Sequence, residues 1–178
     1  GIREMYSSKE NHTRILGNIF VNVNLTSDLE YKFNFGTDSD FGFSKSHQRT
    51  GQITTELVHL SGLSEYNSKS SMLLFENRLT YKKKFGNHDF SVMASQTEQE
   101  FKIHQNGISI VGGFASTNPF FQISATTAAP TDITTSGDEL TSTISSILGR
   151  FTYNYDGKYL FTANVRSDGS SKFPKNNF

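Results

Sequence analysis

Three pairs of runs in which apolar and polar residues alternate dominate this chain, and a very short turn joins the two runs of each pair. In the first pair the apolar residues occupy mainly odd positions, from Ile15 to Leu25 and again from Leu29 to Phe35. Side chains two residues apart share one face of a β-strand, so each run predicts a strand with one apolar face. Residues 26–28 have turn composition, which predicts a hairpin over about residues 14–43.

A second hairpin is predicted over about residues 71–103, with its turn between Lys84 and His88. Its apolar positions are Leu73, Phe75, Leu79, Tyr81, Phe90, Val92 and Ala94, and polar residues such as Glu76, Arg78 and Ser91 alternate with them. A third hairpin is predicted over about residues 144–168 and turns at Asp156-Gly157. Asp-Gly between alternating runs is a strong hairpin signal, because glycine accepts the positive φ that such turns need.

The segments between the hairpins are long and polar and have no sustained period. They cover about residues 44–69 and 104–143 and are rich in Ser, Thr, Gly and Asn. Loops of this length are uncommon in compact soluble domains unless they are functional. Short turns at one end and long loops at the other are typical of a transmembrane β-barrel. The sequence therefore predicts an all-β chain, an antiparallel transmembrane β-barrel segment of about six strands in three hairpins.

Composition agrees with this prediction and argues against other classes. Seventeen basic and seventeen acidic residues cancel, so no charge excess favours a nucleic-acid partner. No apolar run approaches the roughly 20 residues of a spanning helix, and a barrel needs none because only alternate side chains meet lipid. The chain has no cysteine, which excludes disulfides and Cys-based metal sites.

Signatures of catalysis are missing from the sequence. There is no Gly-x-Ser-x-Gly nucleophile motif and no phosphate-binding glycine loop. The five histidines show no close pairing of the kind that binds a metal. We therefore predict that the chain is not an enzyme and binds no metal or cofactor.

A soluble all-β surface adhesin or glycan-binding module is the alternative. Aromatic residues gather beside the short turns, namely Tyr31, Phe33, Tyr81, Phe85, Phe90, Tyr153, Tyr155, Tyr159 and Phe161. In a barrel such rings form a girdle at the membrane interface, and in a soluble sandwich they fill the core. The two readings differ in an observable way, since a sandwich buries these rings and a barrel wall exposes them.

Two stretches carry a specific resemblance. Residues 148–160, LGRFTYNYDGKYL, and residues 165–173, VRSDGSSKF, resemble the barrel signature of the SusC/RagA family of TonB-dependent outer-membrane transporters from Bacteroidetes. Residues 75–88, FENRLTYKKKFGNH, are similar to a second family segment, with Phe75 where Trp is usual. Residues 1–69 agree with the family only in their pattern.

The resemblance implies a protein of the bacterial outer membrane with a large barrel of the 22-stranded, plugged kind. Residues 1–178 would be a partial β-barrel domain, with the plug domain and the remaining strands absent. It also implies import of a nutrient such as an oligosaccharide or a peptide. The implied partners are membrane lipid, a SusD-like lipoprotein lid, and TonB, which would act through the missing plug.

The family-motif residues are predicted to be structural. They are Gly149, Arg150, Tyr153, Tyr155, Tyr159, Arg166, Asp168, Gly169, Ser170, Ser171 and Phe173. We expect Asp168 and the serines to bond nearby backbone, and Gly169 to supply an unusual φ. In the long loops Phe114, Phe120 and Phe121 are candidates for substrate contact, with packing inside the loop as the alternative.

Overall fold

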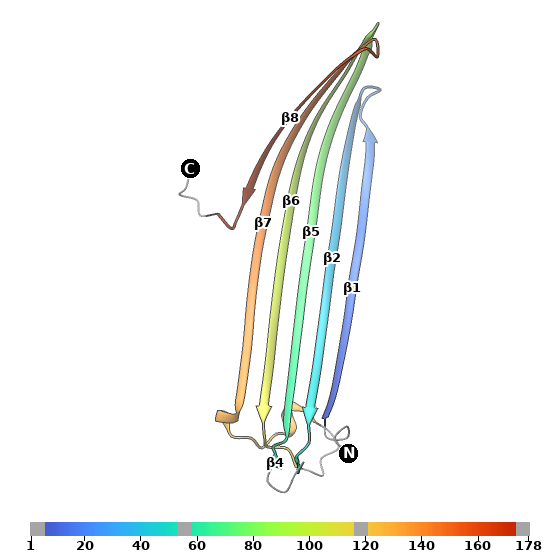
Figure 1. Ribbon diagram of the computed structural model, residues 1–178. Helices are drawn as coiled ribbons and strands as arrows, with labels where there is room; N and C mark the ends of the chain where they lie inside the picture. Colours follow the sequence, from blue (N-terminus) through green and yellow to red (C-terminus); the bar gives the residue numbers. More distant parts are fainter. Residues whose placement is uncertain (1–5, 53–57, 116–120, 174–178) are drawn as a thin grey trace. The chain divides into compact units, whose positions relative to one another are not determined.

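The computed structural model describes residues 6–52, 58–115 and 121–173 of the 178-residue chain. Six strands form one sheet in the order β1-β2-β5-β6-β7-β8, and neighbouring strands run in opposite directions (Figure 1). Their bounds are Tyr6–Asn24 (β1), Leu29–Gln48 (β2), Gly62–Phe85 (β5), His88–Val111 (β6), Ile133–Tyr155 (β7) and Tyr159–Ser170 (β8). The prediction of an all-β antiparallel fold with about six strands is confirmed.

The rest of the described chain adds little regular structure. Strands β3 (Gly51–Gln52) and β4 (Val58–His59) form a two-residue ladder, and Ile123–Ala125 and Pro130–Asp132 are single 3₁₀ turns. The described residues include no helix long and apolar enough to cross a membrane. Within these ranges no second sheet is large enough to pack face to face against the six strands, as the sandwich alternative requires.

The strands are longer than the alternation predicts. β2 continues to Gln48 and β5 begins at Gly62, inside the segment expected to be a loop over residues 44–69. Likewise β6 continues to Val111 and β7 begins at Ile133, inside the expected loop over residues 104–143. These extensions carry polar residues on both faces, so backbone pairing continues where the hydropathy pattern has ended.

By its internal contacts the chain divides into two compact units. One comprises residues 1–14, 40–70 and 103–140, and we call it the loop-end unit. The other comprises residues 15–39, 71–102 and 141–178, and we call it the turn-end unit. The three hairpin turns all belong to the turn-end unit.

The turns have the backbone geometry that the sequence predicts. Asp156 and Gly157 have φ values of 55° and 68°, and the side chain of Asn154 accepts a hydrogen bond from the Gly157 backbone at 3.0 Å. Gly86, in the turn between β5 and β6, has a φ of 57°. Positive φ at these positions suits the twist of two-stranded hairpins, and glycine and aspartate tolerate it better than most residues do.

Candidate functional site

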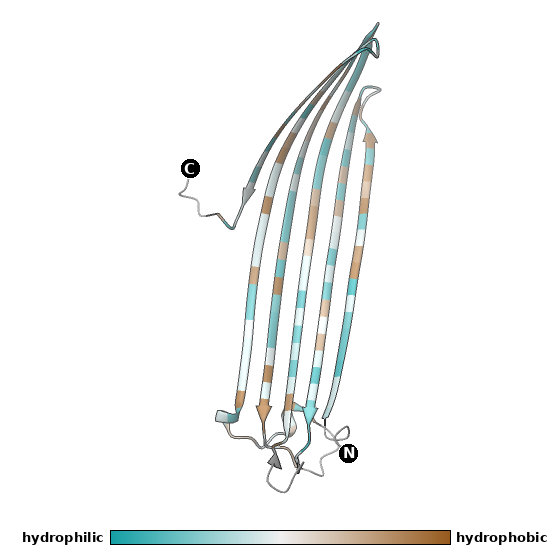
Figure 2. Cartoon of the chain, in the orientation of Figure 1, coloured by the Kyte–Doolittle hydropathy of each residue, from teal (hydrophilic) through white to brown (hydrophobic). Residues whose placement is uncertain are grey.

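The turn-end unit carries a continuous apolar face. Neighbouring strands place their apolar positions on the same side. Two observations show this: the rings of Phe35 and Phe75 lie 5.0 Å apart, and Phe151 is paired with Ala163. Ten side chains of this face are each 41% to 73% exposed, namely Ile15, Ile19, Val21, Val23, Phe75, Leu79, Val92, Ile147, Phe161 and Val165. Figure 2 shows the hydropathy alternating along the strands. A large exposed apolar surface marks contact with lipid or with another protein.

This face has the length of a membrane crossing. Its apolar positions run over residues 15–25, 29–35, 73–85, 90–94, 147–155 and 159–165, which we call the apolar band. The longest of these runs hold about the 9–11 residues that a tilted strand needs to cross a hydrocarbon core. The strands continue well beyond the band on the side of the long loops. Only part of each long strand therefore needs to meet lipid.

Aromatic rings gather beside the turns, as the sequence predicts. Phe90 lies 5.3 Å from Phe85 and 4.9 Å from Tyr153, measured between ring centroids. The Nδ1 atom of His88 is 2.7 Å from the hydroxyl of Tyr153, and the ring of Tyr155 is 5.0 Å from that of His88. Rings with polar groups favour the interface between hydrocarbon and water. The cluster supports the interpretation of a girdle at this end of the wall.

The opposite face of the turn-end unit is polar and contains a cavity of about 290 Å³. Four strands contribute to it, and its polar lining comprises Glu76 and Arg78 from β5, Ser95, Thr97 and Gln99 from β6, Ser146 from β7 and Arg166 from β8. The guanidinium of Arg78 donates to Glu76, while the Nε of Arg78 is buried and has no hydrogen-bond partner. Arg78 belongs to no motif that predicts a site, although the alternation places it on the polar face.

The family-motif residues of β7 and β8 lie on both faces of this sheet. Arg150 donates from Nε to the side chain of Asn164 at 2.8 Å, and Arg166 donates from Nε to both carboxylate oxygens of Asp168 at 2.8 Å and 3.0 Å. Gly149 pairs with Val165. Tyr159 is 70% exposed beside the Asp-Gly turn. These contacts agree with a structural role in the wall.

The end of β8 corrects one expectation. Gly169 does not have a positive φ, since it lies inside β8 and pairs with Ser145 in regular register. The serines do bond nearby backbone, because Ser170 Oγ accepts from the Lys172 amide and Ser171 Oγ accepts from the Thr143 amide. Asp168 instead bonds the side chain of Arg166. The motif ends a strand in regular β conformation, without a glycine-dependent turn at residue 169. Phe173, beyond the strand, is 69% exposed.

The loop-end unit has a small hydrophobic core of its own. Leu63, Ile110, Phe114 and Phe121 are each at most 6% exposed, and the rings of Phe114 and Phe121 lie 5.1 Å apart. The two described candidates for substrate contact, Phe114 and Phe121, therefore pack inside the loop, as the alternative prediction has it. Phe120 lies outside the described residues. A cargo contact by these rings stays a prediction.

His47 extends this core, although no sequence motif singles it out. Its ring stacks on the ring of Phe121 at 4.4 Å between centroids. The guanidinium carbon of Arg49 lies 5.8 Å from the centroid of the Phe121 ring. Burial lowers the pKa of His47 below its ordinary value, and the positive charges of Arg49 and Lys45 lower it further. His47 is therefore held neutral where its ring packs.

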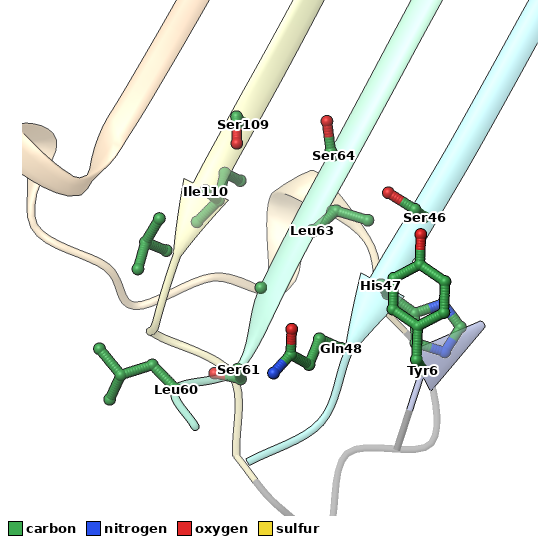
Figure 3. Close-up of a pocket in the computed structure, with 12 residues that line it drawn as sticks. Tyr6, Ser46, His47, Gln48, Leu60, Ser61, Leu63, Ser64, Ser109 and Ile110 are labelled. Carbon is green, nitrogen blue, oxygen red and sulfur yellow. The ribbon is translucent and has the colours of Figure 1, made fainter. Parts of the chain in front are cut away.

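A cavity of about 220 Å³ adjoins His47 in the loop-end unit (Figure 3). Tyr6, Ser46 and Gln48 line it together with Ser61, which precedes β5, and Leu63 from the start of β5. Hydroxyl and amide groups next to a small apolar core can hydrogen-bond a polar ligand. Among the described residues, no group of three or more His, Asp or Glu side chains could hold a metal ion.

Comparison with known proteins gives a consistent answer. No family model matches the sequence. The chain is 29% identical over 175 residues to TonB-dependent receptor P3 of Formosa agariphila, covering 90% of this chain and 16% of that protein. It is 28% identical over 185 residues to TonB-dependent receptor SusC of Bacteroides thetaiotaomicron, covering 98% of this chain and 17% of that protein.

Solved structures agree on the fold. A structure of the RagAB peptide transporter matches with a TM-score of 0.87 at 20% identity, covering 98% of this chain and 19% of that one. The open-open state of the RagAB peptide importer matches with the same TM-score at 19% identity. The predicted resemblance to SusC/RagA-type TonB-dependent receptors is confirmed, and the predicted location in the bacterial outer membrane agrees with it. The chain spans about a sixth of the length of its curated relatives.

Proposed function

We propose that this chain is part of the barrel wall of a TonB-dependent transporter that imports a nutrient, such as an oligosaccharide or a peptide, with a SusD-like lipoprotein partner. The observation that carries the proposal is the two-faced sheet. One face of the turn-end unit presents an exposed apolar band, and the other is lined with arginine, carboxylate, amide and hydroxyl groups. In a transmembrane barrel the first face meets lipid and the second lines the lumen.

The relatives support the transport part of the proposal. SusC and the two Formosa agariphila proteins that match are named as TonB-dependent receptors, and the RagAB structures are named as a peptide transporter and importer. A barrel wall needs no catalytic group of its own. In this proposal energy comes from TonB, and selection of the nutrient comes from the lumen and the long loops.

Deletion of the gene for the complete protein tests import. The deletion strain should lose growth on one class of oligosaccharide or peptide, and a strain lacking TonB should show the same loss. Expression of the complete protein from a plasmid should restore growth only where TonB is present. Unchanged growth on every nutrient that the parent strain uses would contradict the proposal.

Purification of the tagged complete protein from outer membranes tests its partner and its location. A SusD-like lipoprotein should copurify in mild detergent. The protein should also migrate faster in gel electrophoresis before boiling than after, as closed barrels do. Recovery of the protein from the soluble fraction, with migration unchanged by boiling, would favour the adhesin alternative.

A further inference from the structure

Two apolar residues of β1 break the alternation that gives the turn-end unit its two faces. Leu16 and Phe20 occupy even positions, in series with the polar residues Asn18, Asn22 and Asn24. Side chains two residues apart share a face of a strand, so Leu16 and Phe20 project from the polar face. Their side chains are 75% and 57% exposed. The apolar band on the opposite face does not account for them.

Contacts inside the turn-end unit support this placement. The Nζ atom of Lys32, a polar-face residue of β2, lies 4.8 Å from the centroid of the Phe20 ring. A Cβ added to Gly36 would lie 3.7 Å from Asn18 Oδ1 and 3.6 Å from Leu74 Cβ, so these three residues of β1, β2 and β5 are neighbours on one face. Leu74 is half-buried and brings a third apolar side chain next to β1. Together these residues form what we call the β1 patch, which comprises Leu16, Phe20 and Leu74.

The sheet lacks a side chain beside this patch, because Gly36 lies inside β2. The φ of Gly36 is not positive, so the backbone conformation does not require glycine there. The added Cβ would make only ordinary van der Waals contacts, so the wall itself has room for a larger residue. Glycine inside a strand weakens the strand and often marks a place where another backbone approaches closely. A group of exposed apolar side chains likewise marks a surface that another segment or molecule covers.

We propose that the β1 patch is a docking surface for the plug domain of the complete transporter. The inference rests on the proposed function, which turns the polar face of the wall toward the lumen. Barrels of the 22-stranded kind hold a plug in that space. This chain spans about a sixth of the length of its curated relatives, which leaves ample length for such a domain in the complete protein.

A resident domain fits the patch better than passing cargo does. Cargo occupies the lumen only during import, whereas a docked plug removes Leu16 and Phe20 from water for as long as the transporter is closed, and that burial is stabilising. The plug supplies apolar side chains opposite these two residues and brings its backbone close to Gly36. The β1 patch therefore contributes to holding the plug inside the barrel.

Photo-crosslinking in the complete transporter tests the docking surface. The crosslinking amino acid p-benzoylphenylalanine replaces Phe20 in one variant and Val21 in the control, because Val21 is 51% exposed in the apolar band. Irradiation of intact outer membranes, followed by protease digestion and mass spectrometry, identifies what each residue touches. Residue 20 should crosslink to peptides of the plug domain, and residue 21 should crosslink to lipid. Absence of plug peptides among the products of residue 20 would overturn the proposal, whether lipid, cargo or a partner protein is captured instead.

Hydrogen exchange of the plug domain tests the energetic contribution of Phe20. Phe20→Ser should raise amide exchange in the plug at least about fivefold, because it removes an apolar contact that holds the plug in place. Phe161→Ser is the matched control, since Phe161 is also 57% exposed but belongs to the apolar band, and it should leave plug exchange unchanged. Heat-modifiable migration shows whether each variant forms a closed barrel. Equal plug exchange in the two variants would count against the docking surface.

Gly36→Val tests the close approach of the plug backbone, because the added methyl groups would hold the plug away from the sheet and raise its exchange. Gly149→Val is its control, since Gly149 lies on the apolar face and its added Cβ meets nothing within 4 Å. TonB-dependent growth reports the proposed function separately. If that growth is present and residue 20 captures no plug peptide, the docking surface is wrong and the transport function stands.

Discussion

The Nδ1 atom of His88 lies 2.7 Å from the hydroxyl of Tyr153, which links the first residue of β6 to β7 near the hairpin turns. The two residues are 65 positions apart in the chain. Their contact therefore joins two different hairpins, and it belongs to the ring cluster around Phe90. A bond of this kind fixes the register between neighbouring hairpins at the membrane interface.

Replacing Tyr153 with phenylalanine should lower the free energy of unfolding by about 1 kcal/mol, since one hydrogen bond is lost and the ring contacts remain. Urea unfolding of the complete protein in lipid vesicles measures the change. Tyr155→Phe is the control, because Tyr155 meets His88 through its ring, and its effect should be smaller. Equal losses in the two variants would show that the bond to His88 contributes nothing.

Arginine in place of Ala163 should destabilise the barrel by about 2–4 kcal/mol, because Ala163 pairs with Phe151 in the middle of the apolar band and a charge there would face hydrocarbon. Thr162→Arg is the matched control. Thr162 is the preceding residue, and its side chain points to the polar face. Unfolding in lipid vesicles and the yield of folded barrel report both effects. A greater loss for Thr162→Arg would reverse our assignment of the two faces.

Gly113→Ala should open the packing of the loop-end unit. Gly113 has a φ of 72°, and a Cβ there would overlap the backbone of Ala128. Gly112 has a φ of 76° but nothing within 4 Å of its added Cβ, so Gly112→Ala should cost only the roughly 1–2 kcal/mol of left-handed strain. Hydrogen exchange around Phe114 should rise more in the first variant. Similar exchange rates in the two variants would show that the destabilisation comes from the positive φ alone and not from the clash with Ala128.

Acidification should loosen the same core through His47. The pKa of His47 is lowered in the packed loop from its ordinary value of 6.5. At a pH below 6.5 the opened loop therefore binds a proton more readily than the packed loop does. The packing is fully stable above about pH 6.5 and loses stability as the pH falls from there through the lowered pKa. Hydrogen exchange around Phe121, corrected for intrinsic rates, should increase between pH 7.5 and pH 5. His47→Phe should remove that dependence, and a persistent dependence would point to another group.

The side-chain faces of the apolar band could be predicted, because a period of two is visible wherever one face meets an apolar environment. Phe35 and Phe75 were both assigned to the apolar face from sequence, and their rings are in contact. The Asp156-Gly157 turn could be predicted as well, since few residues accept its φ values. Local chemistry was sufficient for these features.

The outer halves of the strands could not be predicted, because polar residues on both faces leave no period to detect. The stretch of β6 from Gln96 to Asn106 is an example. Packing of Phe114 and Phe121 inside the loop was kept open as an alternative, but their contact with Leu63 could not be predicted, since it depends on a chain reversal at Gly112-Gly113 and on a distant strand. Arg78 and Arg166 line one cavity together with residues of β6 and β7. Their proximity depends on how the four strands are shifted along one another, and the lengths of the connecting loops do not predict that shift.

The strict alternation of faces limits how this wall can change its length during evolution. Loss of one residue between Ile147 and Tyr155 would turn every later side chain of β7 to the opposite face. Polar side chains of β7 would then face the fatty acyl chains. Length changes of two residues keep the pattern intact. Homologous walls should therefore vary by even steps within the band and by any number of residues in the long connections.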